Sequence, residues 1–105
     1  MKQGVLVDTG PLVAFLNKRD RFHDWTTAQW NQIAAPMLTC EAVVSESCFL
    51  LSGIKSGSDR VMQLIQREIL MISFHLDEHI DPVKKLLTKY QSVPMSLADA
   101  CLVRM

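Results

Sequence analysis

Short apolar runs alternate with longer stretches of helical periodicity along the chain. The runs at residues 4–7, 36–39 and 70–74 predict strands, because strands covered on both faces are apolar at consecutive positions. Helical spacing predicts helices over residues 11–16, 22–33, 40–51, 59–69, 77–90 and 97–105. Parallel strands need long crossovers, so this alternation predicts an α/β fold, a three-layer arrangement with a central parallel sheet flanked by helices.

Local residues mark where these helices begin and end. Pro11 suits the first turn of the first helix. Gly53 is expected at the C′ position of the helix over 40–51. The stretch 56–59 should hold the next N-cap, and either Asp77 or Asp81 should begin the helix that follows the third strand. Residues 91–94 interrupt the pattern, and Ser96 is then the expected N-cap of the last helix.

Composition narrows the class of protein. The 105 residues are 49% hydrophobic, enough for the core of one domain, residues 1–105. Eleven Lys and Arg balance eleven Asp and Glu, so non-specific attraction to nucleic acid or membranes is not expected. The short apolar run after Met1-Lys2-Gln3 resembles no signal peptide, and no run approaches a membrane span. Three cysteines without C-x-x-C spacing indicate reduced thiols, and a cytoplasmic location is predicted.

Three acidic residues fall where apolar residues are expected. Asp8 ends the first strand, at the edge where open α/β sheets place ligands. Glu46 and Asp99 each have apolar neighbours one helical turn away and are predicted to point inward. Buried carboxylates repel one another and cost several kcal/mol each, so a divalent cation is the expected compensation. Oxygen ligands alone favour Mg²⁺ or Mn²⁺, and such an ion suits phosphodiester hydrolysis.

Structural alternatives exist for each acid. Asp8 alone could cap the helix that follows it. Glu46 and Asp99 could instead be neutralised by buried arginines, for which Arg60, Arg67 and Arg104 are available. Glu41 lies in a first helical turn, where the helix dipole favours an acid, and it receives no chemical role.

The sequence resembles a PIN domain of the VapC toxin type along its whole length. The resemblance rests on residues 5–16 (VLVDTGPLVAFL), 20–23, 41–46 (EAVVSE) and 94–100 (PMSLADA). It implies a Mg²⁺- or Mn²⁺-dependent endoribonuclease, with Asp8, Glu46 and Asp99 as catalytic metal ligands supported by Thr9 and Ser96. It also implies RNA as the substrate, a homodimer, and a cognate antitoxin whose C-terminal segment enters the active site.

Two features depart from the family pattern. Ser96 stands where many relatives carry another carboxylate, which predicts weaker metal binding. The sequence ends at Met105, directly after the helix of Asp99, whereas PIN domains continue into a strand and a fourth acid. The domain is therefore expected to be incomplete at its C-terminus, with one exposed sheet edge and reduced activity.

Other patterns carry weaker functional indications. Residues 75–79 fit the H-x-x-E-H zinc pattern, but His75 follows a strand directly. Lys18, Arg19 and Arg21 form a basic loop that could contact RNA, and Lys85 and Lys89 could extend it. Of Trp25 and Trp30, which could stack on bases, at least one should be a core or interface anchor. The main alternative function is a catalytically silent PIN-like module that binds RNA or protein; a phosphoacceptor domain using Asp8 would need a late-strand Lys.

Overall fold

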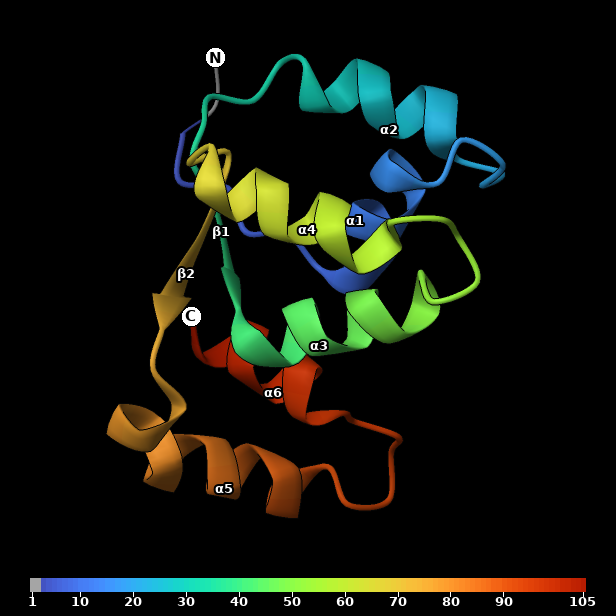
Figure 1. Ribbon diagram of the computed structural model, residues 1–105. Coiled ribbons are helices and arrows are strands. Elements are labelled where there is room, and N and C mark those ends of the chain that lie inside the picture. Colours follow the sequence, from blue (N-terminus) through green and yellow to red (C-terminus); the bar gives the residue numbers. More distant parts are fainter. Residues whose placement is uncertain (1–2) are drawn as a thin grey trace.

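The computed structural model describes residues 3–105. Met1 and Lys2, which belong to the N-terminus that resembles no signal peptide, lie outside the described residues. The elements follow in the order α1 (Thr9–Leu16), α2 (His23–Trp30), β1 (Met37–Cys40), α3 (Glu41–Leu50), α4 (Gly57–Gln66), β2 (Leu70–Phe74), the 3-10 helix η1 (Leu76–His79), α5 (Ile80–Lys89) and α6 (Leu97–Arg104). Figure 1 shows the strands side by side, with helices covering them and α5 at one end. The predicted α/β class with a helix-flanked parallel sheet is confirmed.

The sheet is built around β1. Strand β2 pairs with it in parallel, from Met37 opposite Leu70 to Cys40 opposite Phe74, with an irregularity before Cys40. On the other side of β1, Leu6 forms a parallel bridge to Leu38. The predicted first strand is thus reduced to a short paired segment, residues 5–7, and Leu6 is exposed rather than covered on both faces.

A small apolar core joins the sheet to the helices. Buried side chains of both strands, α1, α3, α5 and α6 form the main cluster, which includes Leu12, Met37, Val43, Leu70 and Val83. Trp30 belongs to it and stacks on Phe15 at 4.0 Å, whereas Trp25 is 65% exposed. The expectation that at least one of the two tryptophans is a core or interface anchor is confirmed.

The ends of the helices agree with most of the predicted signals. Ser56 and Ser96 are the N-caps of α4 and α6. Helix α3, however, ends at Leu50 with Leu51 as its C-cap, so the prediction of Gly53 at C′ is wrong. The Ser52 amide donates to the Phe49 carbonyl and the Ile54 amide to the Leu51 carbonyl, so the chain leaves α3 in a tight turn that does not use a left-handed glycine at 53. The stretch predicted to begin at Asp77 or Asp81 starts as the 3-10 helix at Leu76 and continues as α5 from Ile80.

Three further observations bear on sequence expectations. Cys40, Cys48 and Cys101 are free thiols. Among residues 3–105, no helix is long and apolar enough to cross a membrane. Helix α2 is shorter than predicted, because the chain turns at Asn31 and Ile33 packs against the core from outside the helix.

The first turn of α4 packs directly on the end of α3. A Cβ atom at Gly57 would collide with the carbonyl oxygen of Leu51 and lie 2.8 Å from its Cβ. We expect Gly57→Ala to lower the free energy of unfolding by about 1–3 kcal/mol, as overpacking does, in urea denaturation. Gly53→Ala is the control: nothing lies within 4 Å of its Cβ position, so its change should stay within about 0.5 kcal/mol. Equal stabilities of the two variants would contradict the prediction.

Candidate active site

Asp8 is held at the carboxyl end of the first paired segment. The Val7 amide donates to the Leu38 carbonyl at 2.9 Å, and the buried Thr39 hydroxyl donates to the Val7 carbonyl at 3.0 Å. One step further, Asp8 is the N-cap of α1, and its Oδ1 accepts the Thr9 amide at 2.6 Å. Asp8 therefore does cap the helix, as the structural alternative held, and its side chain is solvent-exposed.

Glu46 reaches the same place from α3. The Thr9 hydroxyl, on a residue that is only 6% exposed, donates to Glu46 Oε2 at 3.2 Å. Glu46 itself is exposed, so the prediction that it points into the core is wrong. The apolar neighbours one turn further on are also exposed, Phe49 at 76% and Leu50 at 53%, whereas Val43 one turn back is buried. That part of α3 faces solvent, although its sequence is apolar.

Asp99 is fixed by a reciprocal cap at the start of α6. The Asp99 amide donates to Ser96 Oγ at 3.0 Å, and the Ser96 amide donates to Asp99 Oδ2 at 3.1 Å. This capping box satisfies two backbone donors that a helix N-terminus otherwise leaves unpaired. Asp99 is half-buried rather than inside the core. Ser96 thus orients the Asp99 carboxylate in the first turn of α6.

The three acids line one surface cleft of about 570 Å³. The cleft is bounded by the first turn of α1, the second half of α3 and the α5–α6 connection, with lining residues Asp8, Thr9, Gly10, Glu46, Leu50, Pro94, Met95, Ser96 and Asp99. Each carboxylate uses one oxygen in the hydrogen bonds found within residues 3–105: Oδ1 of Asp8, Oε2 of Glu46 and Oδ2 of Asp99. One oxygen of each acid is therefore left for a ligand.

The arginines considered as partners for these acids are engaged elsewhere in two cases. Arg60 Nη1 donates to the Leu16 carbonyl at 3.5 Å, and Arg104 Nε donates to His79 Nδ1 at 3.1 Å. None of Arg60, Arg67 and Arg104 lines the acidic cleft. Three carboxylates without a cation in their cleft leave uncompensated negative charge there.

The donor set fits a hard cation. Carboxylate oxygens from three elements and the hydroxyl oxygens of Thr9 and Ser96 surround the cleft, with no thiol or imidazole. Within the part of the chain that is described, no three His, Cys, Asp or Glu side chains stand close enough to hold an ion jointly. The arrangement suits Mg²⁺ or Mn²⁺ bound by one or two carboxylates and completed by water. The catalytic and metal-binding roles of these residues stay predictions.

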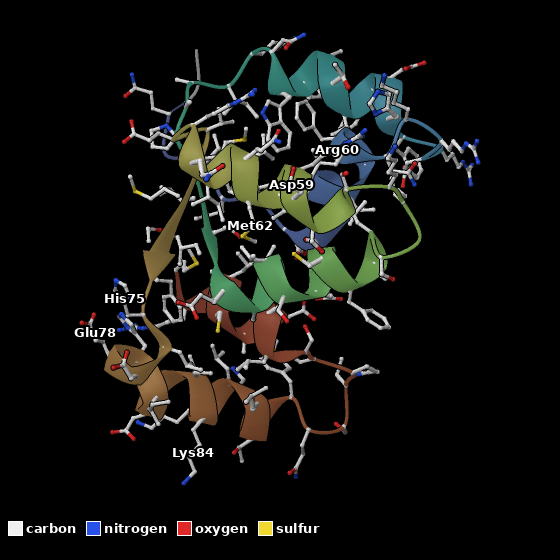
Figure 2. All side chains as sticks on the ribbon, viewed as in Figure 1. Asp59, Arg60, Met62, His75, Glu78 and Lys84 are labelled. Carbon is white, nitrogen blue, oxygen red and sulfur yellow. The ribbon has the colours of Figure 1, made fainter. Side chains whose placement is uncertain are left out.

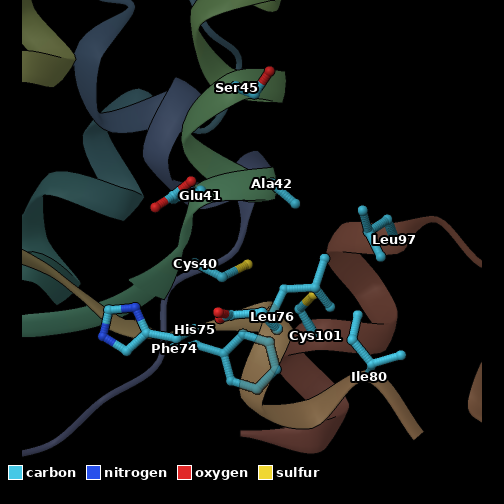
Figure 3. A pocket seen from close by; sticks show the side chains of 11 residues that line it. Cys40, Glu41, Ala42, Ser45, Phe74, His75, Leu76, Ile80, Leu97 and Cys101 are labelled. Carbon is cyan, nitrogen blue, oxygen red and sulfur yellow. The ribbon is translucent and has the colours of Figure 1, made fainter. Parts of the chain in front are cut away.

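A second, mainly apolar pocket of about 520 Å³ lies beyond the carboxyl ends of β1 and β2 (Figure 3). His75 is extended and lies before η1, whereas His79 stacks on Phe74 at 4.7 Å and accepts from Arg104. The H-x-x-E-H pattern therefore does not place its two imidazoles on one helical face. Burial raises the pKa of the Cys101 thiol to about 11, with a further contribution from Cys40, so this thiol stays protonated and inert at neutral pH.

The predicted RNA-contacting loop divides into two parts. Lys18 and Arg19 line a separate pocket of about 320 Å³, together with Lys55 and Arg60. Arg21 instead lies over the Phe22 ring, 5.3 Å from its centroid. Sequence analysis did not connect Lys55 and Arg60 to this loop, because isolated basic residues far apart in the chain carry no local signal.

Comparison with known proteins assigns this chain to a family and finds a solved structure of similar fold. A parallel sheet with an acidic cleft at the carboxyl end of its first paired segment, residues 5–7, is the arrangement of an α/β domain that binds ligands at strand ends. The chain belongs to the PIN domain family, whose family model matches residues 5–104. It is also similar in fold to the crystal structure of VapC20 from Mycobacterium tuberculosis, described as a sarcin-ricin loop cleaving toxin. The TM-score is 0.75 with 18% identity, over 94% of this chain and 78% of that one. No curated protein matches the sequence.

The capping box at the start of α6 should contribute measurably to the free energy of unfolding. We expect Ser96→Ala to lower the free energy of unfolding by about 1 kcal/mol, because α6 loses the hydroxyl that accepts the Asp99 amide. Thermal or urea denaturation would measure the change. Ser45→Ala, at an exposed position of α3, serves as the control and should be nearly neutral. A Ser96→Ala variant as stable as Ser45→Ala would show that the cap contributes nothing.

Proposed function

We propose that this protein is a metal-dependent endoribonuclease of the toxin type, which hydrolyses RNA phosphodiester bonds in the acidic cleft. The observation that carries the proposal is the cleft itself: Asp8, Glu46 and Asp99 come from distant segments and each leaves one oxygen for a ligand. Membership of the PIN family supports a nuclease, and the description of VapC20 as an RNA-cleaving toxin agrees with it.

The residues of the cleft would have metal-binding and positioning roles. One or two of the carboxylates of Asp8, Glu46 and Asp99 would bind the ion directly, and the remaining acid would reach it through bound water. Thr9 holds Glu46 through its hydroxyl, and Ser96 holds Asp99 through the cap. A bound Mg²⁺ or Mn²⁺ lowers the pKa of water and neutralises charge that develops on the phosphate. The three carboxylates alone would repel the RNA backbone, so substrate binding in the cleft requires the cation.

The same proposal includes the partners of a toxin. An antitoxin segment would occupy the cleft and compete with RNA. The exposed apolar side chain of Leu50, which lines the cleft, suits contact with a protein segment. A homodimer, a single domain over residues 1–105 and a cytoplasmic location complete the proposal. Three free thiols fit a reducing compartment.

Asp8→Asn tests the proposal while preserving the fold. Asn caps a helix about as well as Asp, so α1 should remain intact while the charge at the cleft is lost. We expect RNA cleavage with Mn²⁺ to fall by about 100-fold or more, the loss typical when a charge-stabilising group is removed from an active site. Mn²⁺ affinity, measured by calorimetry, should fall in parallel, and Glu46→Gln should behave likewise.

Glu41→Gln is the matched control, because it removes one exposed carboxylate from α3 outside the acidic cleft. Its Mn²⁺ affinity and cleavage rate should equal those of the wild type. A wild-type protein that binds no Mn²⁺ and cuts no RNA would support the alternative, a catalytically silent PIN-like module. Asp8→Asn with full activity would likewise contradict the assignment of the cleft.

A further inference from the structure

The pocket of about 320 Å³ beyond the C-terminal end of α1 is strongly basic. Among the eight residues that line it, all within the described chain, four are cationic and none is acidic: Lys18, Arg19, Lys55 and Arg60. The protein as a whole carries no net charge. The concentration of four cations around one hollow is therefore a local feature of the fold and does not follow from a basic composition.

Two distant segments build this basic pocket. Lys18 and Arg19 follow α1, whereas Lys55 and Arg60 flank the start of α4. Arg60 donates to the Leu16 carbonyl at 3.5 Å, which joins the segments. The acids next in sequence are directed to other partners: Asp20 accepts the Phe22 amide at 2.8 Å, and Asp59 accepts Gln63 Nε2 at 2.9 Å. The four cations thus face the pocket without an acid of their own segments lining it.

Helix α1 connects the basic pocket to the acidic cleft. Thr9, its first residue, lines the cleft, and Leu16, its last, lines the basic pocket. At 1.5 Å per residue the helix separates the two by about 10 Å. Successive phosphates of a stacked nucleic-acid strand are about 3.4 Å apart along its axis. A strand with one phosphate in the cleft would therefore place another at the basic pocket about three nucleotides away.

We propose that the basic pocket binds a backbone phosphate of the RNA substrate, about three nucleotides from the bond that is cut. This inference rests on the proposed nuclease function. An RNA strand is favoured over a free anion because the spacing to the cleft matches the repeat of a polyphosphate chain. Guanidinium and ammonium groups are also the side chains that most often contact phosphate oxygens in such complexes.

The test compares RNA binding by two double variants in the Asp8→Asn background, which prevents cleavage, with Mn²⁺ at a constant concentration that saturates the weakened cleft. Lys55→Gln/Arg60→Gln removes two charges from the basic pocket. Arg67→Gln/Lys84→Gln removes two charges elsewhere; Figure 2 shows Lys84 on α5, far across the view from Arg60. Fluorescence anisotropy follows a single-stranded RNA hexanucleotide and a dinucleotide with Mn²⁺ between about 50 and 200 mM salt.

For the hexanucleotide, Lys55→Gln/Arg60→Gln should reduce the magnitude of the slope of log affinity against log salt by about 0.7, which is the contribution of one phosphate contact on a single strand. The control pair should leave this slope unchanged, and Lys55→Arg/Arg60→Lys should restore it. Binding of the dinucleotide, too short to reach from the cleft, should be the same in all variants.

Equal slopes for the two double variants would overturn the phosphate site. If inorganic phosphate at constant ionic strength fills the pocket at micromolar concentration without weakening hexanucleotide binding, the site serves a free anion and the proposal is also wrong. If the wild type cuts RNA but the two double variants bind the hexanucleotide equally, the phosphate site is wrong and the nuclease function stands. A wild type that neither binds the hexanucleotide nor cuts RNA overturns both proposals.

Discussion

The attachment of residues 5–7 to β1 determines where Asp8 and Thr9 stand in the acidic cleft. This segment pairs with β1 through a few backbone hydrogen bonds around Leu38, and the fully buried Thr39 hydroxyl adds a side-chain bond to the Val7 carbonyl. Asp8 follows at once, so the place of its carboxylate depends on that attachment. Thr39 is one of few buried polar residues, and its hydroxyl is satisfied by this bond.

The acids of the cleft have structural roles beside the chemical roles proposed for them. Asp8 caps α1 and Asp99 completes the cap of α6, and Glu46 is tied to the buried Thr9. A capping role is usually a reason to assign no chemistry to an acid. Here each cap engages only one carboxylate oxygen and orients the other, so local helix stability and the geometry of the cleft depend on the same atoms.

Sequence reasoning found the element types, because strong apolar runs and helical spacing dominate local structure. Ser96 as an N-cap follows from local chemistry and was predictable. The orientation of Glu46 was not, because Phe49 and Leu50 made an exposed face look buried, and exposure depends on which elements pack there. The link of Lys55 and Arg60 to the loop after α1 was also out of reach, since tertiary contacts alone create it.

The charges at the two ends of α1 also concern the helix itself. Asp8 stands at its amino end, and Lys18 and Arg19 follow its carboxyl end, so both sets of charges complement the dipole of the helix. A polyanion approaching this neutral protein meets opposite signs about 10 Å apart, so it is attracted at the carboxyl end of α1 and repelled at the amino end. The polarity of a single short helix would thus decide which of its ends attracts a bare phosphate and which end needs an added cation to do so.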